Sequence, residues 1–89
     1  MKAVITVIGK DMVGILAKVS AVCLKNNINV LEVTQSILQD LFAMVMMVDI
    51  SNSTVPFSDM ALELETLGNS MNLKIHTMHE DIFNSMHRI

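Results

Sequence analysis

The chain has 89 residues, which is enough for one domain and no more. Its formal charge of -3, with basic residues scattered from Lys2 to Arg88, argues against a nucleic-acid-binding surface. No apolar run reaches the roughly 18 residues of a membrane span, and the 52% hydrophobic fraction is high enough to predict burial of apolar surface by self-association.

The first half of the chain predicts a strand, a glycine-bracketed loop, a helix and a second strand. Residues 4–8 are almost all β-branched, which favours a strand buried on both faces and therefore central in its sheet. Residues 15–24 carry a helical apolar stripe that ends at Asn26 and Asn27, which suit a left-handed helix end. Residues 30–38 alternate with polar side chains on one face, as an edge strand does.

The second half predicts two more strands and two helices. A short turn at Gln39 and Asp40 leads into residues 41–48, which are apolar on both faces. On the face away from the helices, Val45 and Met47 either need a second cover, such as another subunit, or only fill a central strand. Pro56 precedes a helix over residues 57–71, residues 72–78 alternate as a strand, and residues 80–89 predict a short amphipathic helix.

This order predicts an α+β fold, a ferredoxin-like βαββαβ sandwich. The four-stranded antiparallel sheet should have the order 4-1-3-2, with two helices on one face. Strands one and three are then central, in agreement with their apolar character on both faces. We assign residues 1–79 to this domain and residues 80–89 to a helical C-terminal extension.

Two stretches of this unit resemble the signature of ACT domains. Residues 11–19 read DMVGILAKV and residues 27–30 read NINV. ACT domains are small βαββαβ modules that bind amino acids or similar metabolites and pass the signal to a partner. The similarity runs nearly end to end and is strongest to the short stand-alone ACT proteins (UPF0237-like), through the loop pattern GKDxxGI and the later VTQS. The loop is also similar to that of the tandem-ACT repressors of the glycine-cleavage system.

The resemblance implies a ligand bound between the first loop of one subunit and an edge strand of its neighbour. The backbone of residues 12–15 would meet the ligand carboxylate, Asp11 its ammonium group, and the Asn29 amide would hydrogen-bond the amino acid. Free N–H groups at a helix N-terminus suit a carboxylate, although Gly14 alternatively only permits a tight turn. The implied ligand-binding residues are Asp11, Met12, Val13, Gly14, Ile15, Asn29 and Val30.

Proteins of this fold with other functions depend on residues that this chain does not have. An RNA-binding sheet stacks bases on aromatic side chains, but the chain has only three phenylalanines and no tyrosine or tryptophan. The first loop has neither the Cys-x-x-Cys pair of a metal chaperone nor the phosphate-binding arginine of an acylphosphatase. No nucleophile–base–acid set is visible, so we expect no enzymatic activity and no cofactor.

Four polar residues at the end of the last predicted strand raise the question of a metal site. His76, His79, Glu80 and Asp81 are of the types that bind divalent ions. Because residues three apart at a strand end point to opposite faces, solvated polar side chains are the favoured interpretation, and we assign no metal site.

Cys23 lies on the apolar helical stripe as a core thiol. A lone cysteine forms no internal disulfide, which favours a cytoplasmic location.

Two functional hypotheses remain. The first is a regulatory ACT domain that binds a small molecule, an amino acid by resemblance, at a dimer interface. It would form a homo-oligomer, a dimer or a tetramer, and modulate a partner enzyme or transcription regulator without touching nucleic acid or membrane. The alternative is a homodimeric docking module that has no ligand.

Overall fold

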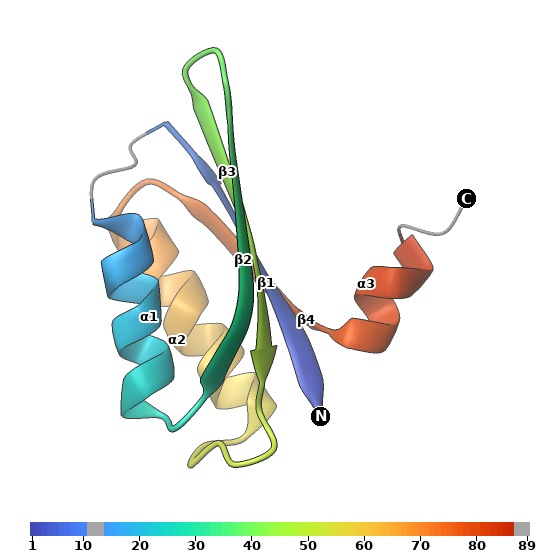
Figure 1. Ribbon diagram of the computed structural model, residues 1–89. Helices are drawn as coiled ribbons and strands as arrows, with labels where there is room; N and C mark the ends of the chain where they lie inside the picture. Colours follow the sequence, from blue (N-terminus) through green and yellow to red (C-terminus); the bar gives the residue numbers. More distant parts are fainter. Residues whose placement is uncertain (11–13, 87–89) are drawn as a thin grey trace.

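The computed structural model describes residues 1–10 and 14–86 (Figure 1). Its four antiparallel strands lie in the order β2-β3-β1-β4, which is the predicted order 4-1-3-2 counted from the other edge. The predicted ferredoxin-like fold is therefore confirmed. The elements in chain order are β1 (Lys2–Gly9), α1 (Ile15–Lys25), β2 (Asn29–Leu38), β3 (Leu41–Asp49), α2 (Phe57–Ser70), β4 (Lys74–His79) and α3 (Glu80–Met86).

The core lies between the sheet and the layer formed by α1 and α2 (Figure 1). Strands β1 and β3 are central, and every second side chain of each is buried toward the helices, as with Ile5, Met44 and Met46. Cys23 of α1 is buried in this core as predicted, and burial raises the pKa of its thiol. None of the described helices has the length and apolar character needed to cross a membrane.

Three turns use non-glycine residues in the left-handed region. Asn27 follows α1 with φ 58°, as its position in the sequence predicts, and Gln39 and Asn72 adopt φ 59° and 58°. Asn72 therefore belongs to a turn, and β4 begins at Lys74 rather than at the predicted residue 72. Gly68, near the end of α2, is buried where the helix passes so close to β4 that a Cβ would lie 2.8 Å from Ile75 Cγ1.

The edge strand β2 is the least covered part of the sheet. Its register with β3 contains an irregularity between Val30 and Glu32. Val33 points to the helix side, opposite Met46, yet is 39% exposed, and Ile37 is 60% exposed. The strand therefore lies at an edge, as predicted, with neither face fully covered.

The C-terminal segment forms α3, on the face of the sheet opposite α1 and α2 (Figure 1). The helix covers residues 80–86 of the predicted extension, and residues 87–89 lie outside the described residues. None of its residues is buried.

Candidate functional site

The loop before α1 carries the first group of predicted ligand contacts. Asp11, Met12 and Val13 lie outside the described residues. Gly14 is the residue before the helix and has a left-handed backbone, φ 75° and ψ 2°. A Cβ built on Gly14 would meet nothing within 4 Å. The positive φ alone accounts for glycine here.

The start of α1 offers backbone groups rather than side chains. Among the described residues no side chain caps this end, and its first turn contains no acidic residue. The Gly14 carbonyl accepts a hydrogen bond from the Lys18 N–H at 3.0 Å, which closes the first turn of the helix. Ile15 as a whole residue is 1% exposed, so in the single chain it offers a ligand almost no accessible surface.

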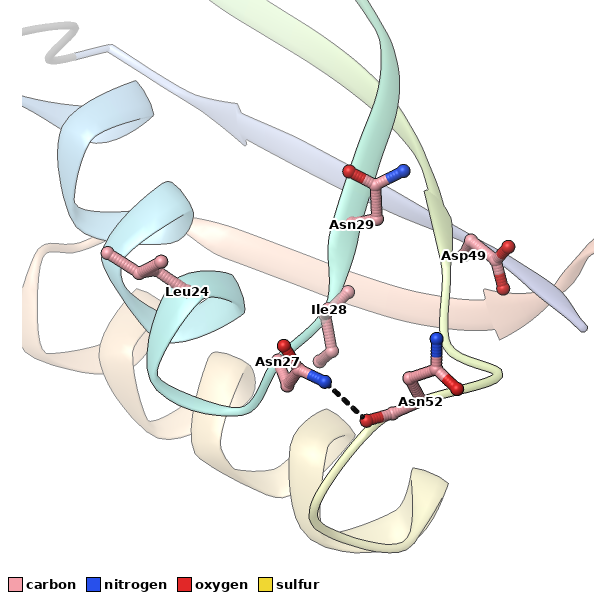
Figure 2. Close-up of a pocket in the computed structure, with 6 residues that line it drawn as sticks. All are labelled: Leu24, Asn27, Ile28, Asn29, Asp49 and Asn52. Carbon is pink, nitrogen blue, oxygen red and sulfur yellow. Dashed lines mark hydrogen bonds between the residues drawn. The ribbon is translucent and has the colours of Figure 1, made fainter.

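The second group of predicted contacts, Asn29 and Val30, lies at the beginning of β2. Asn29 lines a hollow of about 380 Å³ formed by the C-terminal end of α1, the start of β2 and the end of β3 (Figure 2). Asn29 is exposed, and no side-chain hydrogen bond is made to its amide within the described part of the chain. The residues that line the hollow are Leu24, Asn27, Ile28, Asn29, Asp49 and Asn52.

Polar groups dominate this hollow. Asn27 donates a hydrogen bond from Nδ2 to the backbone carbonyl of Asn52 at 3.0 Å, which ties the turn after α1 to the loop after β3 (Figure 2). Asp49 is the direct neighbour of Asn29 across the β2–β3 pair. The hollow therefore combines amide donors and acceptors with one carboxylate.

Asp49 is held in its charged form by its surroundings. The Ser51 N–H donates to Asp49 Oδ1 at 2.9 Å, and the terminal ammonium of Met1 lies 3.7 Å from the same oxygen. The hydrogen bonds from Ser51, followed by this ammonium, hold the pKa of the Asp49 carboxyl below its ordinary value. Asp49 is therefore an anion at neutral pH and accepts hydrogen bonds only.

Such a set of groups suits a small zwitterion. Amide N–H₂ groups can donate to a carboxylate, while amide oxygens and Asp49 can accept from an ammonium group. Of the lining residues, sequence reasoning assigned a binding role only to Asn29. Asn27 was interpreted as a helix end, and Asp49 and Asn52 are polar residues at a strand end and in a loop, with no signal that brings them together.

One protomer does not bring the two groups of predicted contacts together. Gly14 precedes α1 and Asn29 follows it, so they lie at opposite ends of this helix (Figure 1). Its 11 residues span roughly 16 Å at about 1.5 Å per residue. A single small ligand therefore cannot contact both residues within one chain.

The histidines near the end of β4 also separate in space. His79 stacks on Phe57 of α2, with ring centroids 4.1 Å apart, and His76 lines a hollow on the other face of the sheet. In residues 1–10 and 14–86, no three histidine, cysteine or acidic side chains gather as metal ligands do.

Comparison with known proteins agrees with this architecture. The sequence profile of the ACT domain family matches residues 2–78. A UPF0237 protein of Methanocaldococcus jannaschii is 47% identical over 88 residues, which cover 99% of this chain and 98% of that protein. An ACT domain protein from Streptococcus pneumoniae has a solved structure with a TM-score of 0.81 and 36% identity, covering 93% of each chain.

A more distant similarity shows the fold alone. A structure described as a glycine cleavage system transcriptional repressor has a TM-score of 0.70 at 22% identity, over 85% of this chain and 43% of that one. The UPF0237 protein, which aligns over nearly its whole length, and the family profile lead to the same assignment. The chain belongs to the ACT domain family, a family of regulatory domains, and is similar throughout to its short UPF0237 members.

Proposed function

We propose that this protein senses an amino acid at an interface between two of its own copies and regulates a partner protein. The observation that carries the proposal is the separation of Gly14 from Asn29 by the length of α1. The helix start of one copy and the polar hollow of the next can each supply half of a site. A ligand that needs both halves then binds only the assembled form.

The exposed edge of the sheet supports the assembly that such a site needs. β2 has an unpaired edge, and four of its apolar side chains are between 36% and 60% exposed. An edge of this kind pairs readily with another strand. The exposed apolar residues are Val30, Leu31, Val33 and Ile37. Pairing of two copies along β2 would also bury Val30, which resemblance places beside the ligand.

Regulation follows from the linkage between ligand and assembly. A ligand that binds only the paired form shifts the equilibrium toward that form by its differential affinity. A coupling of about 1–3 kcal/mol is usual for such linkage. Any effect on an enzyme or on a transcription regulator would pass through the paired form. We expect the protein to act in the cytoplasm and to catalyse no reaction itself.

Thermal unfolding with each of the twenty amino acids, added singly at millimolar concentration, tests the proposal. A ligand that binds only the native state raises stability by RT ln(1 + [L]/Kd), about 2.7 kcal/mol at a hundredfold excess over Kd. We expect one or two amino acids to raise the unfolding temperature. No shift with any amino acid, in a folded and dimeric protein, would contradict the proposal.

Variants locate the site. Asn29→Ala and Gly14→Ala should each abolish the stabilisation by the ligand while the dimer is retained. Asn69→Ala, at an exposed position of α2, is the matched control and should leave binding unchanged. Binding that survives both of the first two changes would place the site elsewhere.

The alternative function is a docking module without a ligand. The half-buried apolar side chains of β3 on the face away from α1 and α2, Val45 and Met47, favour it, because such a face is suited to another protein. A flat amino-acid panel together with a stable dimer would favour this alternative.

A further inference from the structure

α3 and the face of the sheet away from α1 and α2 bound a second hollow, of about 470 Å³. α3 contacts both β1 and β4, and the hollow lies between that helix and these two strands (Figure 1). Among the residues that line it are one histidine and two methionines, His76, Met78 and Met86. None of the three lines the polar hollow at Asn29, so this place is separate from the amino-acid site proposed above.

Two of these side chains come from β4 and point the same way. His76 pairs with Thr6 of β1 and Met78 pairs with Val4, so both lie on the face away from the core. Residues two apart on a strand share a face, and their Cα atoms are about 7 Å apart. An imidazole nitrogen and a thioether sulfur at this spacing can reach a single ion placed over the strand.

The third side chain comes from α3. Met86 lines the same hollow from the helix and is 70% exposed. A methionine has three rotatable bonds, so its sulfur can move while the backbone stays in place. Because core packing does not hold Met86, its thioether can turn toward an ion bound by His76 and Met78.

These donors favour one kind of ion. Thioether sulfur is a soft ligand that selects Cu(I), and imidazole also suits copper. Carboxylates, which calcium, magnesium and manganese prefer, do not line this hollow in residues 1–10 and 14–86. The three donors carry no negative charge, and the other walls include the apolar Ile8 and Phe83. A monovalent ion therefore costs less to desolvate here than a divalent one.

Packing alone accounts less well for these residues. α3 has no buried residue, so Met86 adds little to the core. The Thr6 hydroxyl donates to the backbone carbonyl of His76 at 3.5 Å, but within the described part of the chain no hydrogen bond is made to the His76 ring. The ring nitrogens of His76 and the sulfur of Met86 are therefore available as ligands.

We propose that His76, Met78 and Met86 bind one Cu(I) ion between β4 and α3. The donors come from two elements, so the bound ion connects them. Isolated helices as short as α3 are unstable in water, and α3 buries none of its residues. The ion therefore adds a contact that holds this helix against the sheet.

Titration with Ag(I) tests the site. Ag(I) has the same charge and the same preference for soft ligands as Cu(I), and it stays monovalent in air. We expect one ion per chain by isothermal titration calorimetry. Met78→Leu and Met86→Leu each remove a sulfur at nearly constant volume, and each should weaken binding at least about tenfold. Met47→Leu, on the same face of the sheet but outside the hollow, is the matched control and should leave binding unchanged.

Cys23 carries the only thiol of the chain and is a competing soft ligand. It is 1% exposed in the core beneath the helices, so binding there would not respond to the methionines. Unchanged binding in the double variant Met78→Leu and Met86→Leu, or an equal loss with Met47→Leu, would overturn the proposal. Competition with the chelator bicinchoninate under reducing conditions then measures Cu(I) itself. Tighter binding of Zn(II) than of Cu(I) would overturn the choice of ion.

Amide hydrogen exchange tests the effect on α3. With Ag(I), the amides of residues 80–86 should exchange more slowly in the wild type, because the ion holds the helix against the sheet. Their rates should not change with Ag(I) in Met86→Leu, which lacks the donor on the helix. Equal rates with and without Ag(I) in the wild type would show that α3 takes no part in binding, and would overturn the proposal.

Discussion

The two faces of the sheet use the same strands but different degrees of cover. On the helix side, α1 and α2 bury the central strands completely, so that Met44 and Met46 are 0% exposed. On the face away from α1 and α2, which we call the open face, the intervening Val45 and Met47 of β3 are only half-buried. The difference comes from the cover, because α1 and α2 cover the central strands on one side, whereas α3 contacts only β1 and β4 on the other. The helix side therefore forms the core of the fold, and the open face keeps apolar side chains that are only half-buried.

The largest difference should come from two adjacent methionines. Met46→Ala removes a fully buried side chain from the core, and we expect a loss of about 2–5 kcal/mol in the free energy of unfolding. Met47→Ala, on the open face, should cost about 1 kcal/mol. Urea unfolding at low protein concentration measures both. Equal losses would mean that the open face is packed as tightly as the core.

Gly68 tests how closely α2 approaches β4 on the helix side. An added Cβ would lie 2.8 Å from Ile75 Cγ1 and 3.0 Å from the Leu73 carbonyl oxygen. Because the backbone carbonyl cannot move aside easily, Gly68→Ala should destabilise the protein by about 1–3 kcal/mol despite the better helix propensity of alanine. Asn69→Ala, at the exposed next position, is the control. A stabilising Gly68→Ala would show that the two elements can separate at little cost.

A polar link between α1 and α2 should contribute as much to the free energy of unfolding as the close packing at Gly68, or less. Asn26 is 4% exposed and donates from Nδ2 to Glu63 Oε1 at 3.0 Å, while Lys25 forms an ion pair with the same carboxylate. Glu63→Ala leaves the buried amide without this acceptor, and we expect a loss of about 1–3 kcal/mol by urea unfolding. The exposed Glu65→Ala is the control, and a similar small effect of both would contradict a role for the link.

The same link predicts a pH dependence. The hydrogen bonds from Lys25 and then Asn26 hold the pKa of Glu63 below its ordinary value of 4.5. A depressed pKa contributes stability that is complete above 4.5 and is lost as pH falls through the lower folded value. The difference between wild type and Glu63→Ala should therefore shrink in that acidic range. A difference that grows on acidification would show that the carboxylate is not what stabilises the pair.

The smallest effect should come from β2, where the described side chains are exposed on both faces of the sheet. Val33 points to the helix side but is 39% exposed, because the helices do not extend over this edge strand. In protein dilute enough to be a single copy, Val33→Thr should change the free energy of unfolding by no more than about 0.5 kcal/mol. A larger loss that appears only in concentrated protein is expected from the proposed pairing of two copies along β2, and a large loss in dilute protein would show that the single chain already covers this edge.

Much of the fold could be predicted because its patterns are local. The β-branched run of β1 correctly predicts a central strand, and Asn27 predicts the left-handed end of α1. The expected burial of that run on both faces was wrong at Ile8, which is 44% exposed on the side away from α1 and α2. The boundary of β4 was wrong by two residues, because the alternation of residues 72–78 favours a strand while Asn72 adopts the left-handed turn that ends α2. The close approach of α2 to β4 at Gly68 leaves no local signal.

The candidate site was predicted less completely. Resemblance implies a ligand at Gly14 and at Asn29, and the helix predicted over residues 15–24 already separates these two positions. Asn27, Asp49 and Asn52 come from a helix end, a strand end and a loop, and they meet only after the sheet has formed. A hollow assembled from two distant stretches, residues 24–29 and 49–52, has no signature in either of them.

The sequence by itself determined the strand and helix order, the family and the apolar character of both central strands, because alternation and helical periodicity act over a few residues. Only the tertiary structure decided which face became the core and where the polar hollow formed. Those properties depend on how α1 and α2 cross the sheet, and that crossing is fixed by contacts between residues distant in the chain.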